Sequence, residues 1–362
     1  MPFGDLRRAV VAITDPRAAR SEHGTLTLMT LAPRIANLLE CREARSPYVV
    51  PACTLTRAEA ALLHVRDEND LFGGVVPHAF VATKVISHPV PPWCSEHPEG
   101  WSDALGVALE DHVLPGYSVF NHEDALRAGT FLLGDGPVRV KPADGIGGGG
   151  QCVIDSAPAL QDLLAGIDVS QLGEHGIVIE RNLVQETTYS IGELVLGGMR
   201  AAYWGIQRQS RNHAGRPVYG GSDLYVVRGA LGDLLPKAPD EDVRQAIGHA
   251  MRYEAAVFAA YPDTFASRRN YDVAIGHDAC GRPWCGVLEQ SWRIGGASPA
   301  EIAALEAFAS DSQRHEVHVS THEVYELADL PDGAQLHYRG TDPVEGCLTK
   351  YSRVHADGYP SR

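Results

Sequence analysis

The stretch that decides the fold is VRVKPADGIGGGGQCVI, residues 138–154. Its glycine loop, which opens at Gly145 and ends at Gly150, fits G-x-G-x-x-G, a pattern typical of dinucleotide-binding proteins. In those proteins the glycines lead directly from a strand into a helix, whose amides hold the pyrophosphate. Here residues 151–154 read as a second strand, and the next helix begins only after Ser156. The context of a dinucleotide site is therefore missing.

A Walker A phosphate loop is also missing, because Gln151 and Cys152 follow the last glycine where Lys and Ser or Thr are required. What remains is a strand, a lysine, a glycine-rich hairpin and a strand. Free backbone amides of such a hairpin can donate to phosphate oxygens, and glycine allows the close approach. Lys141, one of four lysines in the chain, adds a positive charge beside the loop. An unliganded surface turn is the competing interpretation, but ordering this many glycines would cost considerable entropy.

The composition excludes several classes of function. The chain has 362 residues and 44% hydrophobic content, enough for a sizeable core in two or three lobes. Its formal net charge of −15 disfavours a nucleic-acid partner, and the sequence has no basic stripe. No apolar run approaches the roughly 20 residues that a membrane span needs. The seven cysteines form no CxxC pair, which is typical of reduced thiols in a cytoplasmic protein.

The periodicity of the chain changes twice. Residues 1–112 alternate strand-like and helix-like segments, which predicts a small α/β domain. The glycine loop lies in the second part, residues 113–310, and the remaining residues, 311–362, read as a β-rich extension. Two capping boxes predict helix starts, one at Thr56 with Glu59 and one at Ser298 with Glu301.

The order of these elements resembles the ATP-grasp superfamily. Residues 138–154 are similar to its lysine strand and glycine flap, and VLPGYSVFNHEDALRAG (113–129) matches the segment before that strand. VIERNL (178–183) is similar to the adenine hinge, within residues 176–190. YDVAIGHDACGRPWCGVLEQSWRIGG (271–296) is similar to the hairpin that carries the metal ligands. The resemblance implies an α/β (α+β) fold: an N-terminal domain, two ATP-grasp lobes sandwiching the nucleotide, and a β-rich tail. The whole chain also resembles a proteobacterial family of unknown function with ATP-grasp character.

The resemblance assigns the nucleotide site residue by residue. Lys141 takes the place of the phosphate-binding lysine, which also assists catalysis. Lys84 is a candidate second phosphate lysine, with an ordinary charge as an equal alternative. Residues 187–188, where the family has its ribose-binding acid, are threonines, and the nearest acid is Glu186. The remaining assigned residues are Gly147, Gly148, Gly149 and Gly150 in the flap, and Glu180 and Leu183 at the hinge.

A metal site is expected at Asp272 and Glu289. These acids stand near the ends of two predicted antiparallel strands, where they could share one face and reach a common ion. Magnesium prefers oxygen ligands and bridges carboxylates to phosphates, whereas unpaired acids in buried strands would be costly. The resemblance adds Ser291, where the family has asparagine, as a third ligand. It also assigns Arg293 to the substrate carboxylate or acyl phosphate.

Together these features predict an ATP-dependent ligase that uses Mg²⁺, with Mn²⁺ as an alternative ion. It would activate a small-molecule carboxylate as an acyl phosphate for attack by an amine or a thiol. Two alternatives stay open: a non-catalytic ATP-binding sensor or scaffold on the same frame, and an NAD(P)-dependent oxidoreductase. The sequence does not reveal the substrate, and a homodimer is the default expectation for its assembly.

Overall fold

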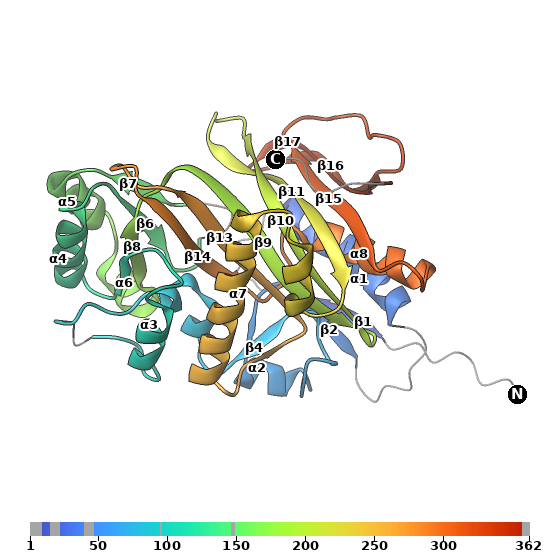
Figure 1. Cartoon of the computed structure of the whole chain (residues 1–362), viewed down its shortest axis with the longest axis horizontal. Helices are drawn as coiled ribbons and strands as arrows, with labels where there is room; N and C mark the ends of the chain where they lie inside the picture. The colour runs from blue at the N-terminus through green and yellow to red at the C-terminus, as the bar shows by residue number, and fades with distance from the viewer. Residues whose placement is uncertain (1–8, 15–21, 40–46, 95, 146–148, 357–362) are drawn as a thin grey trace, which may run out of the picture.

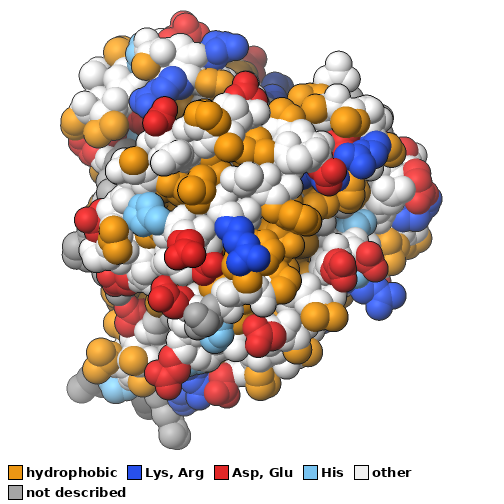
Figure 2. Space-filling view, turned by 90° about the vertical axis from the view of Figure 1, so that its left-hand side faces the viewer, with side chains coloured by type: hydrophobic (Ala, Val, Ile, Leu, Met, Phe, Trp, Pro, Cys, Tyr) orange, Lys and Arg blue, Asp and Glu red, His pale blue; other side chains and the backbone are white. Residues whose placement is uncertain are grey.

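The computed structural model describes residues 9–14, 22–39, 47–94, 96–145 and 149–356. Figure 1 shows these residues arranged around a long sheet, with a smaller sheet and its helices at one end. In the part of the chain that the structure describes, no helix is both long and apolar enough to cross a membrane. Figure 2 looks onto the end that carries the smaller sheet. Acidic and basic side chains are interspersed there, and hydrophobic ones gather across the middle of the view.

The smaller sheet contains the glycine loop. Its four strands lie in the order β5-β8-β6-β7, all antiparallel, and the loop connects β6 to β7. The helix α4 (His122–Leu133) begins after Asn121, because the Asn121 side chain accepts a hydrogen bond from the Asp124 amide and caps the first turn. The other elements are α5 (Ala157–Ala165), α6 (Val169–His175), β5 (Gly116–Val119), β6 (Val138–Pro142), β7 (Cys152–Ile154) and β8 (Ile177–Arg181).

The larger sheet has eight strands in the order β14-β13-β9-β10-β11-β15-β17-β16, and every pair is antiparallel. The strands of the C-terminal segment thus continue the sheet of the central one. The strands are β9 (Val184–Leu196), β10 (Met199–Arg211), β11 (Pro217–Arg228), β13 (Arg268–His277), β14 (Pro283–Ser291), β15 (Glu316–Val324), β16 (Gln335–Asp342) and β17 (Gly346–Val354).

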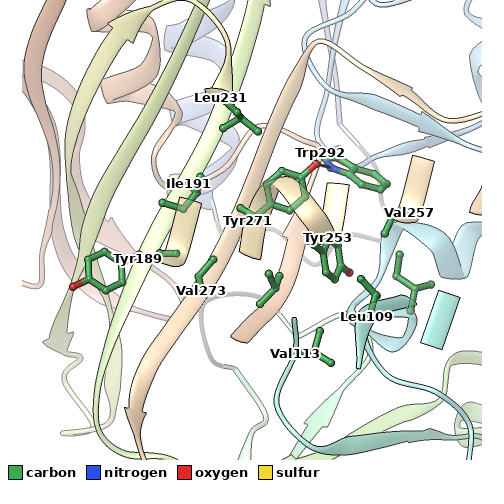
Figure 3. Packing of buried hydrophobic residues seen from close by; sticks show 14 of the residues in the cluster. Leu109, Val113, Tyr189, Ile191, Leu231, Tyr253, Val257, Tyr271, Val273 and Trp292 are labelled. Carbon is green, nitrogen blue, oxygen red and sulfur yellow. Dashed lines mark hydrogen bonds between the residues drawn. The ribbon is translucent and has the colours of Figure 1, made fainter. Parts of the chain in front are cut away.

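Helices cover both faces of the larger sheet because its side chains alternate between them. Tyr203 belongs to the core under α8 (Ser298–Ser310) and α1 (Glu22–Leu38), whereas Trp204 belongs to the core under α7 (Glu241–Ala260). Figure 3 shows the second core, where Tyr253 and Val257 of α7 lie near Tyr271 and Trp292. All four of these side chains are almost fully buried.

The N-terminal segment forms two small parallel pairings, β1 with β2 and β3 with β4, and strand β12 of the central segment joins β4. Strands of one segment thus pair with strands of another, as β12 does with β4 and β11 with β15. The domain boundaries at 112 and 310 therefore stay a prediction. The elements here are β1 (Val10–Ile13), β2 (Tyr48–Pro51), β3 (Leu55–Thr56), α2 (Arg57–Leu62), β4 (Gly74–Val76), η1 (Ala79–Ala82), η2 (Lys84–Ser87) and α3 (Asp103–Leu109). The central segment adds β12 (Phe265–Ala266) and a short helix η3 (Leu231–Lys237), which packs against α7 and β10.

The two predicted capping boxes have different outcomes. At Thr56 the box is confirmed: its hydroxyl accepts from the Glu59 amide, and Glu59 accepts from the Thr56 amide. At Ser298 the prediction is wrong, because α8 begins at Ser298 itself and the capping position is Ala297. Glu301 is instead fully buried against Arg268, an ion pair that local sequence could not reveal.

Candidate nucleotide and metal site

Lys141 lies at the centre of a buried charge cluster in the smaller sheet. Its Nζ is 2.5 Å from Glu180 Oε1, and His88 Nε2 is 3.0 Å from Glu180 Oε2. Lys141 and Glu180 come from neighbouring strands β6 and β8 and lie diagonally on one face. Burial by itself would raise the pKa of Glu180, but Lys141 and His88 outweigh it and lower the pKa to about 2. Glu180 is therefore an ionised acid next to Lys141, and the assignment of both residues to the nucleotide stays a prediction.

The glycine flap begins beside Lys84. Lys84 Nζ donates to the Gly145 carbonyl oxygen at 2.7 Å, and it forms an ion pair with Glu289 Oε2, also at 2.7 Å. The lysine is only 3% exposed. Three segments that are distant in the sequence, the N-terminal part, the flap and the β13–β14 hairpin, therefore meet at one ammonium group.

The two described ends of the flap, at Gly145 and Gly149, approach each other closely. An added Cβ at Gly145 would lie 2.6 Å from the carbonyl oxygen of Gly149, so no larger residue fits without moving the hairpin. Gly150 has a φ of +74°, a conformation that favours glycine. Gly147 and Gly148 lie outside the described residues. Because β7 pairs with β6 directly after the loop, the strand-to-helix turn of a dinucleotide site is absent here, and the oxidoreductase alternative loses its structural basis.

Asp272 and Glu289 are paired across β13 and β14, as the hairpin pattern predicts. Burial and then the negative charge of Glu289 raise the pKa of Asp272 to about 6. For Glu289, burial acts in the same direction, but the ion pair with Lys84 outweighs it and leaves the pKa below its ordinary value. Two adjacent carboxylates with partial solvent access match the oxygen ligands of Mg²⁺ or Mn²⁺, so the residues present fit such an ion.

A buried network behind the carboxylate pair was missed by sequence reasoning. Asn270 Nδ2 donates to Asp272 Oδ1 at 2.8 Å, and the Tyr203 hydroxyl lies 2.9 Å from Asn270 Oδ1. The same hydroxyl lies 2.6 Å from Glu301 Oε1, which is held by Arg268 through two hydrogen bonds. These contacts join β10, β13 and α8, and they restrict the position of Asp272.

Ser291 and Arg293 lie close to the same network. Arg268 Nη1 donates to the Ser291 carbonyl and lies 3.3 Å from its hydroxyl, so Ser291 as a metal ligand stays a prediction. Arg293 Nη1 donates to the carbonyl of Ile294 at 2.9 Å. Burial and then the nearby charge of Arg268 lower the pKa of Arg293. Its assignment to the substrate also stays a prediction.

The two remaining hinge residues have distinct environments. Leu183 is buried with Leu114 and Ala274, where the smaller sheet meets β13. Glu186 Oε1 is 3.6 Å from Arg139 Nη2, within a loose, partly exposed ion pair. Leu183 is placed to form an apolar wall, and Glu186 to offer a carboxylate at the edge of the hinge. Both assignments to the nucleotide stay predictions.

Comparison with solved structures identifies the fold. The chain is similar to N5-carboxyaminoimidazole synthetase from Staphylococcus aureus, with a TM-score of 0.51 and 12% identity over 99% of this chain and 96% of that chain. A second similar structure is phosphoribosylamine–glycine ligase from Thermotoga maritima, with a TM-score of 0.48 and 14% identity over 88% and 80% of the two chains. At 12% identity the likeness to the first structure concerns the fold alone, which is the predicted α/β ATP-grasp architecture.

Comparison of sequences identifies the family. The curated proteins contain no match to this chain. A family model described as "Protein of unknown function (DUF3182)" matches residues 10–352, nearly the whole sequence. The chain therefore belongs to this family of proteins of unknown function, DUF3182, and folds as an ATP-grasp protein.

Proposed function

We propose that this protein is an ATP-dependent ligase that activates a substrate carboxylate as an acyl phosphate. The observation that carries the proposal is the position of Lys84, whose ammonium group contacts both the first glycine of the flap and Glu289. In such a reaction the metal ion bridges the protein carboxylate and the nucleotide phosphates. The phosphate-binding flap and the metal-binding carboxylate must therefore lie next to each other. The ATP-grasp fold, shared with a synthetase, supports the same conclusion.

The roles of the residues follow from their positions. Lys141, Lys84 and the flap amides would hold the β- and γ-phosphates, while Glu180 and Leu183 border the adenine. Asp272 and Glu289 would hold Mg²⁺, which supplies charge neutralisation at the phosphates when bound. The lysines offset negative charge that develops on the transferred group, and they do so in a site largely shielded from water. Arg293, half-buried beside the carboxylate pair, would face the substrate carboxylate.

The proposed reaction has two steps. An oxygen of the substrate carboxylate attacks the γ-phosphorus, and the bond to the bridging oxygen breaks, so that ADP leaves with the electron pair. The nitrogen of an amine or the sulfur of a thiol then attacks the acyl carbon, phosphate leaves, and the nucleophile loses its proton. The flap would keep water from the acyl phosphate between the two steps.

The test is ADP release with Mg-ATP across a panel of amino acids, short peptides and dicarboxylates. We expect ADP only with a suitable carboxylate, and a hydroxamate when hydroxylamine replaces the natural nucleophile. The double variant Asp272→Asn/Glu289→Gln should lose this activity while it remains folded. Normal turnover by that variant would contradict the proposed mechanism.

A second candidate is an ATP-binding sensor or scaffold that does not turn over. It is favoured by the contact of Arg268 with Ser291, because a cation beside this hydroxyl weakens it as a metal ligand. Nucleotide binding by calorimetry, without ADP release across the whole panel, would support this candidate over the ligase.

A further inference from the structure

A second polar cluster lies away from the carboxylate pair. It consists of Asp223 on β11, His318 on β15 and His355, which directly follows β17. One ligand atom from each residue lies within 4.8 Å of those from the other two. Strands β9 and β10 separate β11 from β13 in the sheet, which corresponds to roughly 14 Å at ordinary strand spacing. The cluster is therefore distinct from the site at Asp272.

The backbone holds these three residues together. Asp223 is paired with Ser320, so His318, two residues earlier on β15, projects from the same face of the sheet. The His355 amide donates to the His318 carbonyl at 2.9 Å and places the two imidazoles side by side. Their rings are stacked, with centroids 4.1 Å apart. Ser320 Oγ lies 2.7 Å from His355 Nε2 and orients that ring.

His318 is a largely buried histidine whose ring nitrogens have no hydrogen-bond partner among the described residues. Its side chain is only 10% exposed, and within the described ranges neither ring nitrogen makes a hydrogen bond. Its Nε2 lies 3.8 Å from Asp223 Oδ1, too far for a hydrogen bond but suited to an atom between them. A buried polar group without a partner costs on the order of 1–3 kcal/mol. A ligand that accepts the imidazole lone pair would remove this cost.

The charges around the cluster favour neutral imidazoles. Burial and then the charge of Arg208 lower the pKa of His318, while burial and then His318 lower the pKa of His355 to about 4. Neutral imidazole is the form that binds metals. Arg208 contacts Asp223 through Oδ2, which leaves Oδ1 directed toward His318. The same arginine donates to the Thr321 carbonyl at 2.7 Å, so it is anchored independently of the aspartate.

We propose that Asp223, His318 and His355 bind one late first-row divalent metal ion, such as Zn²⁺. Two imidazoles and one carboxylate are a common zinc ligand set and leave a fourth position open. The ligand type also separates this site from the one at Asp272 and Glu289, because imidazole favours zinc whereas an all-carboxylate pair favours magnesium. Since the rings are stacked, one imidazole must turn about its side-chain bonds when the ion binds. The bound ion would tie the end of β17 to β11 and β15.

The experiment uses the full-length, chelator-treated protein without nucleotide. Co²⁺ is titrated while the visible spectrum is recorded, and Zn²⁺ binding is measured by equilibrium dialysis. We expect one tight ion per chain, with d–d absorption bands and no intense thiolate-to-cobalt band. The absence of that band would distinguish imidazole and carboxylate ligands from cysteine thiolates.

Three variants test the ligands separately: Asp223→Asn, His318→Gln and His355→Gln. Each should weaken Co²⁺ binding by at least about 10-fold, the loss that removal of a supporting partner alone can produce. Two controls should keep the affinity, His277→Gln at an exposed histidine and Asp272→Asn at the carboxylate pair. Thermal unfolding without metal checks that each variant is folded. His355→Gln, beyond the last strand, is the substitution that disturbs the sheet least.

Two results would overturn the proposal. In the first, all three variants bind Co²⁺ as tightly as the unmodified protein. In the second, Asp272→Asn abolishes the single tight site, or thiolate bands dominate the spectrum. None of these measurements requires ATP turnover, and an ion lost in Asp272→Asn would agree with the proposed magnesium site, so failure of this proposal and failure of the proposed ligase activity are distinguishable.

Discussion

The two lysine clusters of the site differ in how their charges are balanced. Lys141 and Glu180 form a closed pair within one small sheet, completed by His88, and all three side chains are at most 3% exposed. Lys84 forms an ion pair with Glu289 of the larger sheet, whose side chain is 27% exposed and which is paired with Asp272 across the two strands. In the first cluster both oxygens of Glu180 have a partner, whereas in the second the negative charge of Glu289 acts on the neighbouring Asp272 carboxylate. We infer that the first serves mainly to hold a phosphate lysine in place and the second to receive a cation and phosphates.

The largest expected effect is a loss of stability when the first cluster, that of Lys141, Glu180 and His88, loses its lysine. Lys141→Met should destabilise the protein by about 3–5 kcal/mol, because it leaves the buried Glu180 carboxylate without its cation. The measurement is urea unfolding at pH 7. Lys237→Met is the matched control, since Lys237 forms an exposed pair with Glu316 and should change stability by less than about 1 kcal/mol. Equal stability of the two variants would show that the Lys141 pair is not a closed structural unit.

A pH series probes the same cluster. The pKa of Glu180 is about 2 in the folded protein against an ordinary 4.5, so its ionisation stabilises the fold above pH 4.5. This contribution is on the order of 3 kcal/mol and should disappear as the pH falls from 4.5 toward 2. Urea unfolding at pH 7, 4 and 3 should therefore show a steeper acid loss for the unmodified protein than for Glu180→Gln. Parallel curves for the two proteins would contradict the assignment.

Substitution in the second cluster, that of Lys84 and Glu289, should change nucleotide binding more than it changes the stability of the fold. Lys84→Met should weaken Mg-ATP binding by about 10- to 100-fold, because the flap and Glu289 lose their common cation. The stability loss should be smaller than for Lys141→Met, since Glu289 retains access to solvent. Calorimetric titration and urea unfolding of both variants give the comparison directly. If Lys84→Met lost stability but kept its affinity, the distinction between the clusters would be wrong.

The smallest effect is expected at Asn270, which positions Asp272. Asn270→Ser should cost about 1–2 kcal/mol of stability, because it removes the hydrogen bond to Asp272 and the contact of the Tyr203 hydroxyl with the amide oxygen. It should weaken Mn²⁺ binding by about 10-fold while it leaves the Lys141 cluster unchanged. Electron paramagnetic resonance of free Mn²⁺ reports the affinity. An unchanged Mn²⁺ affinity would show that Asn270 only supports packing.

Local sequence was enough to predict several elements of this fold. The capping box at Thr56 depends on residues only three apart in the chain. The facing positions of Asp272 and Glu289 follow from the alternation of two strands joined by a short turn. In each case the partners are close in the chain, so backbone geometry alone brings them together.

Contacts between distant segments could not be predicted in this way. The Ser298 capping box failed because Glu301 of the helix pairs with Arg268, which the distant strand β13 supplies. The contact of His88 with Glu180 and the cluster of Asp223 with His318 and His355 depend on how the sheets and the C-terminal strands assemble. The sequence by itself therefore determined a lysine strand, a glycine hairpin and an acidic strand pair. Only the tertiary structure decided that Lys84 contacts both the glycine hairpin and the acidic strand pair. The reason is that sequence periodicity shows on which face of an element a side chain lies, but not which distant element packs against that face.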